Sequence, residues 1–143
     1  MICYFDTSAF VPLLIAEPGS PACADLWNAA DAVVSSRLLH AETAAALAQA
    51  ERLGRVTAAE YTQARELLDD LWTQIHVLDT DQELVERAAD LARSAGPGGH
   101  DAVHCACAER LKSGDLVVAP GDRRLLEACA SLGLSVSDTS SPR

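Results

Sequence analysis

Four acidic residues stand where an apolar run ends or a helical pattern begins. Asp6 directly follows the apolar run Ile2–Phe5, and Glu42 lies early in the apolar stretch LLHAETAAAL. Asp101 and Asp122 each follow a glycine-containing break and precede an apolar helical pattern. Taken singly, each has a structural explanation, because aspartates cap helices by accepting backbone N–H groups and glutamates commonly lie on surfaces. Taken together, they suggest a site built from carboxylates.

Carboxylates brought close together repel one another strongly at low dielectric. A divalent cation removes that conflict. Mg²⁺ prefers oxygen ligands, uses few carboxylates and keeps waters free for a substrate phosphate. The chemistry that such a site supports is metal-assisted hydrolysis of a phosphodiester bond.

The elements that must position these acids are indicated by short apolar runs alternating with longer helical patterns. Strands are predicted at residues 2–5, 32–36, 75–78, 116–119 and 134–136. Helices are predicted at about residues 22–30, 38–53, 57–72, 81–91, 100–111 and 123–132. This alternation predicts an α/β fold, a three-layer α/β/α domain with a mostly parallel sheet of about five strands. Ligand sites in such sheets form at the carboxyl ends of the strands, where Asp6 stands.

The 143-residue length suits one domain, which we expect to span residues 1–136 with a polar tail at 137–143. No apolar run approaches the roughly 20 residues of a membrane-spanning helix, and no basic segment of a secretory signal is present. Five cysteines, an odd number, fit reduced thiols in a core and a cytoplasmic location. The net charge of −10 argues against a protein that holds nucleic acid by charge alone.

Four motifs in this order carry a resemblance to a known family: FDTSA, LLHAETAAAL, GGHDAVHCACA and GDRRLLEAC. Over essentially its whole length the chain resembles the PIN-domain ribonucleases, specifically the VapC-type toxins of bacterial toxin–antitoxin modules. The resemblance implies an endoribonuclease that cuts RNA, is silenced by a cognate VapB-like antitoxin and forms a homodimer. It further implies that Asp6 and Asp101 are the main ligands of Mg²⁺ (or Mn²⁺), and that Glu42 and Asp122 complete the acidic pocket.

The resemblance also implies residues that support these acids, and at one position the chain departs from the family pattern. Ser8, together with Thr7, would orient Asp6 by hydrogen bonding. The family usually has a hydroxyl residue two positions before its last acid, whereas this chain has Pro120 before Asp122. The role of Asp122 is therefore the least secure of the four.

Basic residues near the acids offer a way to guide RNA on an acidic protein. Arg37 lies close to Glu42 in the sequence, and Arg123 and Arg124 follow Asp122, although charged residues in a first helical turn are commonplace on surfaces. The acidic surface would also suit a basic arm of an antitoxin.

Other functions fit the sequence less well. His100 and His104, with cysteines nearby, suggest zinc, but the paired spacing of a zinc ribbon is missing and His104 is expected to be a packed helix residue. A phosphatase with a phosphoryl-accepting aspartate would need a second Asp where Ser8 stands. A receiver domain would need adjacent acids after its first strand and a late lysine, whereas the only lysine, Lys112, is expected on a helix. The remaining alternative is a catalytically silent PIN-fold protein that only binds a partner.

Overall fold

The computed structural model describes residues 1–119 and 121–137. The elements follow one another as β1 (Ile2–Phe5), α1 (Thr7–Phe10), η1 (Val11–Leu13), α2 (Ser20–Ala29), β2 (Ala32–Ser36), α3 (Leu38–Arg52), α4 (Ala58–Trp72), β3 (Ile75–Leu78), α5 (Gln82–Ser94), α6 (Gly99–Arg110), β4 (Leu116–Ala119), α7 (Arg123–Ser131) and β5 (Ser135–Val136). Here η1 is a short 3₁₀ helix.

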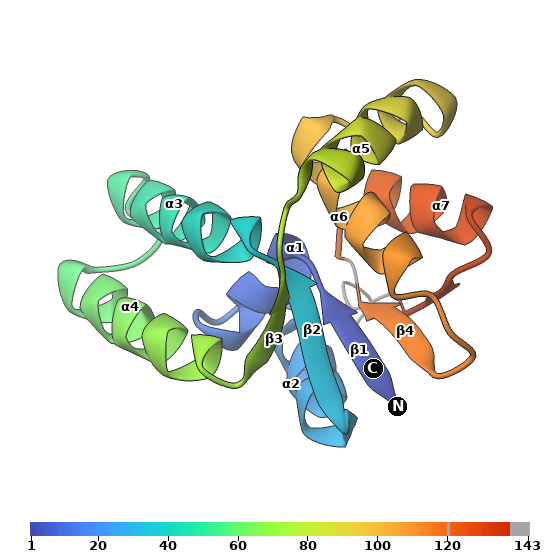
Figure 1. The fold of residues 1–143 in the computed structure, drawn as a ribbon. Helices are drawn as coiled ribbons and strands as arrows, with labels where there is room; N and C mark the ends of the chain where they lie inside the picture. The colour runs from blue at the N-terminus through green and yellow to red at the C-terminus, as the bar shows by residue number, and fades with distance from the viewer. Residues whose placement is uncertain (120, 138–143) are drawn as a thin grey trace.

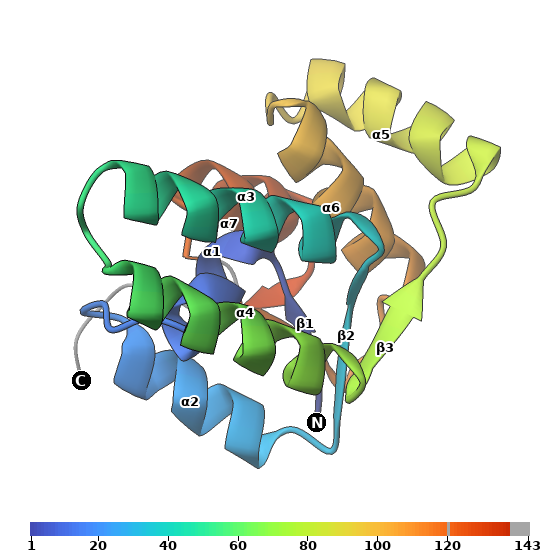
Figure 2. The same cartoon turned by 90° about the vertical axis from the view of Figure 1, so that its left-hand side faces the viewer.

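The five strands form one parallel sheet in the order β3-β2-β1-β4-β5. Helices α2, α3 and α4 lie on one side of it and α5, α6 and α7 on the other (Figures 1 and 2). This arrangement confirms the predicted three-layer α/β/α fold. The strand order reverses between β1 and β4, which pair from Ile2 opposite Leu116 to Phe5 opposite Ala119. The crevice beyond such a reversal is the usual ligand site of a parallel sheet.

Alternate residues of β1 serve the two faces of the sheet. Cys3 and Phe5 pack with α1, α2 and the α3–α4 pair, and Tyr4 packs with α5, α6 and α7. A strand buried on both sides must be apolar along its whole length, which explains the run that ends at Asp6. All five cysteines are buried thiols that form no disulfide bond, as predicted.

Most predicted elements agree with the structure to within two residues at each end. The short helices α1 and η1, which follow Asp6, were not predicted as elements. The predicted capping box is present, because Thr57 and Glu60 each accept a backbone N–H from the other. Residues 138–143 of the expected tail, and Pro120, lie outside the described residues. Within the described part of the chain, no helix combines the length and apolar character needed to span a bilayer.

Candidate active site

Asp6 lies at the carboxyl end of the central strand and caps the helix that follows. One carboxylate oxygen, Oδ1, accepts the backbone N–H of Ala9 at 3.2 Å. The other, Oδ2, accepts the hydroxyl of Ser8 at 2.6 Å. The side chain is only 2% exposed, and this burial raises the pKa of Asp6, although His104 and Ser8 oppose the shift. The helix cap therefore satisfies one carboxylate oxygen, but it does not remove the free-energy cost of burying the negative charge.

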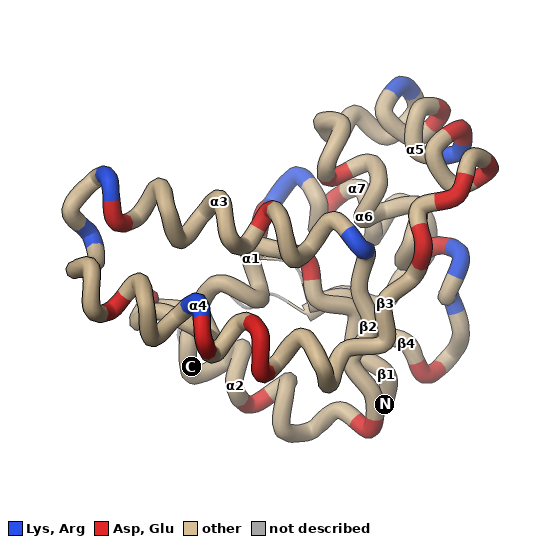
Figure 3. The backbone as a smooth tube through the Cα atoms, turned by 60° about the vertical axis from the view of Figure 1, so that its left-hand side comes forward, with Lys and Arg blue, Asp and Glu red and all other residues tan. Residues whose placement is uncertain are grey.

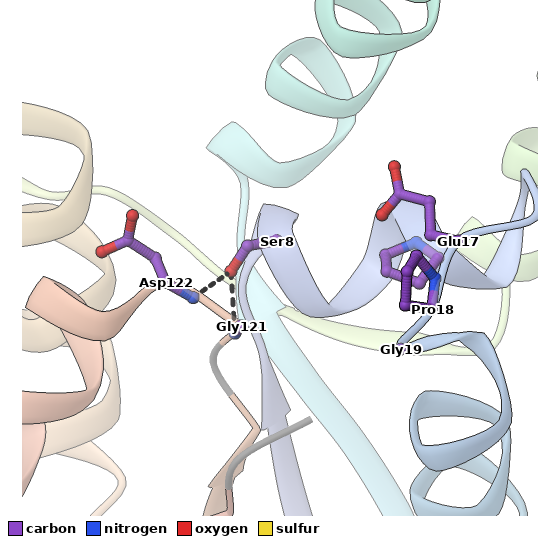
Figure 4. Close-up of a pocket in the computed structure, with 7 residues that line it drawn as sticks. Ser8, Glu17, Pro18, Gly19, Gly121 and Asp122 are labelled. Carbon is purple, nitrogen blue, oxygen red and sulfur yellow. Dashed lines mark hydrogen bonds between the residues drawn. The ribbon is translucent and has the colours of Figure 1, made fainter. Parts of the chain in front are cut away.

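Ser8 joins the ends of β1 and β4. Its hydroxyl donates to Asp6 and accepts the backbone N–H groups of Gly121, at 2.8 Å, and Asp122, at 3.0 Å (Figure 4). The backbones approach closely here, since a Cβ at position 121 would lie 3.0 Å from the carbonyl oxygen of Ser8. Any larger residue here would force the Ser8 backbone to shift by a few tenths of an ångström. The expected role of Ser8 in orienting Asp6 has a matching hydrogen bond, and Asp122 itself caps α7.

Glu42 projects from the second turn of α3 toward α6. Its Oε1 lies 2.7 Å from Nε2 of His104, and its Oε2 lies 3.3 Å from Nδ1 of His100. Burial opposes ionisation of Glu42, but the hydrogen bond from His104 and the nearby imidazole of His100 hold its pKa below the usual value. Glu42 is therefore ionised at neutral pH.

His104 is the buried residue behind Glu42. It is 1% exposed, as expected of a packed helix residue, and its Nδ1 lies 2.7 Å from the hydroxyl of Tyr4 on β1. The Tyr4 hydroxyl, the His104 ring and the Glu42 carboxylate are all hydrogen-bonded when the Tyr4 O–H donates to Nδ1 of His104 and the Nε2–H of His104 donates to Glu42. This hydrogen-bonded chain was not predicted.

Asp101 occupies the third position of α6 and does not cap that helix, whose N-cap is Gly98. Burial raises the pKa of Asp101, and the negative charges of Asp122 and Glu42 raise it further. The carboxylates of three different elements therefore influence one another through space, as expected of acids that share a site.

The structure brings all six predicted site residues to the wall of one cavity of about 340 Å³. Its walls also include residues that the sequence analysis did not single out for the site: Val11, Ile15, Glu17, Ala46, Ala50, Arg55 and His104. A neighbouring cavity of about 380 Å³ shares Ser8, Glu17 and Asp122 with it (Figure 4). The expected guides Arg37, Arg123 and Arg124 are absent from these described walls, and Arg37 is paired with Asp79.

The donor set suits a hard cation such as Mg²⁺. Among residues 1–119 and 121–137, no three acidic, histidine or cysteine side chains lie close enough together to hold a metal directly. Mg²⁺ does not need three, because it is commonly bound by one or two carboxylates and keeps several waters. The buried hydroxyl of Thr7, which lies beside Glu42 on the cavity wall, makes no well-formed hydrogen bond within the described residues. It still lies close enough to Glu42 to lower the pKa of that carboxyl.

Comparisons with known proteins agree with this geometry. The profile of the PIN domain matches residues 3–130. Two Mycobacterium tuberculosis proteins, Ribonuclease VapC45 (strain CDC 1551 / Oshkosh) and Ribonuclease VapC49 (strain ATCC 25618 / H37Rv), are each 40% identical over 134 residues, which cover 94% of this chain and 93% of theirs. The crystal structure of FitAcB from Neisseria gonorrhoeae superimposes with a TM-score of 0.72 at 19% identity, over 97% of this chain and 98% of that one.

The chain therefore belongs to the PIN-domain family and, within it, to the VapC type. The resemblance drawn from the four motifs is confirmed. The likeness to the two mycobacterial ribonucleases, at 40% identity, covers 94% of this chain, whereas the likeness to FitAcB concerns the fold alone.

Proposed function

We propose that the protein is a Mg²⁺-dependent endoribonuclease that acts as the toxin of a toxin–antitoxin pair, and that Mn²⁺ can replace Mg²⁺. The observation that carries the proposal is the shared cavity, in which Asp6, Glu42, Asp101 and Asp122 meet beyond the carboxyl ends of β1 and β4. The names of the two mycobacterial relatives support ribonuclease activity.

In this proposal Asp6 and Asp101 hold the cation, and Glu42 and Asp122 hold its waters. A bound cation would acidify a water and stabilise negative charge on the phosphoryl oxygens. Ser8 bonds both to Asp6 and to the backbone of Asp122, so it holds these two acids, which follow separate strands, at a fixed distance from each other.

Glu42 needs a different support, because it comes from a helix on the opposite side of the cavity from α6. The Nε2–H of His104 holds one of its oxygens and leaves the carboxylate ionised. An ionised Glu42 is the form that can accept hydrogen bonds from water near the scissile phosphate.

We further propose a VapB-like antitoxin as partner, a homodimer as the assembled form and the cytoplasm as the location. The buried thiols, which form no disulfide bond, suit a reducing compartment. Antitoxin binding through a basic segment would weaken as salt is added, because screening reduces attraction between exposed charges.

The test is cleavage of total RNA by the purified protein in Mg²⁺, in EDTA and with the Asp101→Asn variant. Discrete fragments are expected only from the wild-type protein in Mg²⁺. Fragments that persist in EDTA, or with Asp101→Asn, would reject the metal site. Absence of cleavage by antitoxin-free protein in every condition would favour a silent PIN-fold protein that only binds a partner.

A further inference from the structure

Arg55 is the one arginine or lysine among the described residues that line the acidic cavity. Five carboxylates share that wall with it: Asp6, Glu17, Glu42, Asp101 and Asp122. On a protein of net charge −10, an RNA strand that enters this cavity is repelled by these carboxylates and attracted by Arg55.

The backbone conformation at the end of α3 fixes the position of Arg55 on the cavity wall. Gly54 adopts a positive φ of 73°, and its N–H donates to the carbonyl of Glu51. The N–H of Arg55 donates to the carbonyl of Ala50 at 2.8 Å. These two bonds form a Schellman motif, which fixes the first residues beyond a helix. The basic segments at this turn lie at the end of α3 far from the sheet (Figure 3).

The position of Arg55 along the cavity wall suits contact with a backbone phosphate next to the scissile one. Glu42, Ala46 and Ala50 line the cavity at intervals of one helical turn, so the wall follows one face of α3. Glu42 and Ala50 are separated by eight residue steps, about 12 Å along the helix axis. Arg55 follows beyond the end of the helix, so its guanidinium is placed beside the backbone on one side of the scissile phosphate.

The contact that Arg55 makes in the free protein is weak enough to exchange. Its Nη2 donates to Oε1 of Glu17 at 3.2 Å, and its side chain is 57% exposed. Such exposed pairs contribute little to stability. The bond to Glu17 engages one of five guanidinium donors, which match the oxygens of a phosphate in pairs.

We propose that Arg55 is an RNA-binding residue of the cavity: it holds a backbone phosphate adjacent to the scissile one, and Glu17 holds Arg55 until RNA displaces it. This proposal rests on the proposed ribonuclease function and identifies where the strand lies. It predicts that the bound RNA strand follows the α3 wall from Glu42 to Arg55.

The test measures binding of a short fluorescein-labelled single-stranded RNA of mixed sequence by anisotropy, in Mg²⁺, with all proteins carrying Asp101→Asn. Arg55→Gln is expected to weaken binding about tenfold and to reduce the slope of log affinity against log salt by about 0.7. The matched control is Arg52→Gln at the same helix end, where Arg52 pairs with Gln49 and does not line the cavity. Arg52→Gln should change the affinity and the salt slope only by the small amount expected from the loss of one positive charge anywhere on the surface.

Glu17→Gln supplies a change in the opposite direction. It frees Arg55 and is expected to tighten binding about twofold, an effect that should disappear when Arg55→Gln is also present. In the cleavage reaction, with Asp101 intact, Arg55→Gln should raise KM and leave kcat nearly unchanged, because the contact lies away from the reacting atoms.

Two results separate this inference from the proposed function. Equal losses of RNA affinity for Arg55→Gln and Arg52→Gln, with Mg²⁺-dependent cleavage intact, would overturn the phosphate contact alone. An Arg55-specific loss of affinity in a protein whose wild type cuts no RNA would reject the nuclease and keep the phosphate contact.

Discussion

His104 of α6 and Glu42 of α3 meet across the cavity, with Nε2 and Oε1 2.7 Å apart. The other ring nitrogen of His104 contacts the hydroxyl of Tyr4 at 2.7 Å. The central strand thereby sets the position of a carboxylate that belongs to a helix on the opposite face of the sheet. Residues that orient metal-site carboxylates in this way commonly change metal affinity or activity when they are replaced.

We expect His104→Leu to lower the RNA cleavage rate and the Mn²⁺ affinity by about 10- to 100-fold, because Glu42 loses its orienting donor. His104→Gln, which keeps an N–H donor, should recover part of both. Mn²⁺ affinity is measured by titration of the isolated protein, independently of cleavage. His40→Leu is the control, since His40 lies on the same helix as Glu42 and pairs with exposed Asp69 outside the cavity. Unchanged Mn²⁺ affinity in His104→Leu would contradict the orienting role.

Ser8→Ala is expected to destabilise the protein by about 1–3 kcal/mol, because two backbone N–H groups lose their acceptor and Asp6 loses its donor. Urea unfolding measures the change, and the cleavage rate should fall with it. Ser131→Ala removes a hydroxyl of α7 that bonds only locally, to the carbonyl of Ala128, and should cost less. Equal losses in the two variants would show that Ser8 does not join the strand ends as described.

The sequence predicted the strands and their terminal acids because these features are local. An apolar run that stops at Asp6, and a glycine before Asp122, can be read without knowing the fold. By contrast, α1 and η1 escaped prediction because TSAFVPLL shows neither helical nor alternating periodicity.

Contacts that cross the fold could not be predicted. The pair Glu42–His104 joins positions 62 residues apart, and the sequence marked His104 only as a packed helix residue or a weak zinc candidate, without pointing to Glu42. Arg55 gave even less signal, since basic residues near a helix C-terminus are common for reasons of helix capping alone. Arg55 becomes part of the cavity wall only because α3 packs beside α1 and the loop that carries Glu17.

Mg²⁺ is expected to raise the melting temperature of the metal-free wild-type protein, by an amount equivalent to about 2.7 kcal/mol at 100 times the dissociation constant. Asp101→Asn should melt higher than wild type without metal, because Asp122 and Glu42 repel the charge of Asp101, and should respond less to Mg²⁺. Asp70→Asn, on the exposed face of α4, is the control for a lost surface charge. Scanning fluorimetry in EDTA and in Mg²⁺ gives both quantities. A full Mg²⁺ response in Asp101→Asn would exclude Asp101 as a ligand.

The stability of the metal-free protein should depend on pH with opposite signs at Asp6 and Glu42. Burial raises the pKa of Asp6, so the folded state binds more protons than the unfolded state between the ordinary value of 3.8 and the raised one. Ionised Asp6 therefore costs stability as pH rises through its folded pKa, and Asp6→Asn should gain on wild type toward neutral pH. The pKa of Glu42 is lowered by His104, so its contribution is present above the ordinary value of 4.5 and is lost as pH falls through the folded pKa.

Glu42→Gln should accordingly be less stable than wild type at neutral pH and approach it in acid, the reverse of the trend for Asp6→Asn. Urea unfolding in EDTA from neutral pH to about pH 3 measures both trends on one set of samples. The change of each difference with pH, rather than its size at one pH, reports the titration, because the lost hydrogen bonds of either variant contribute a constant offset. Parallel stability curves for wild type and both variants would mean that neither carboxylate is held in the environment that the cavity provides.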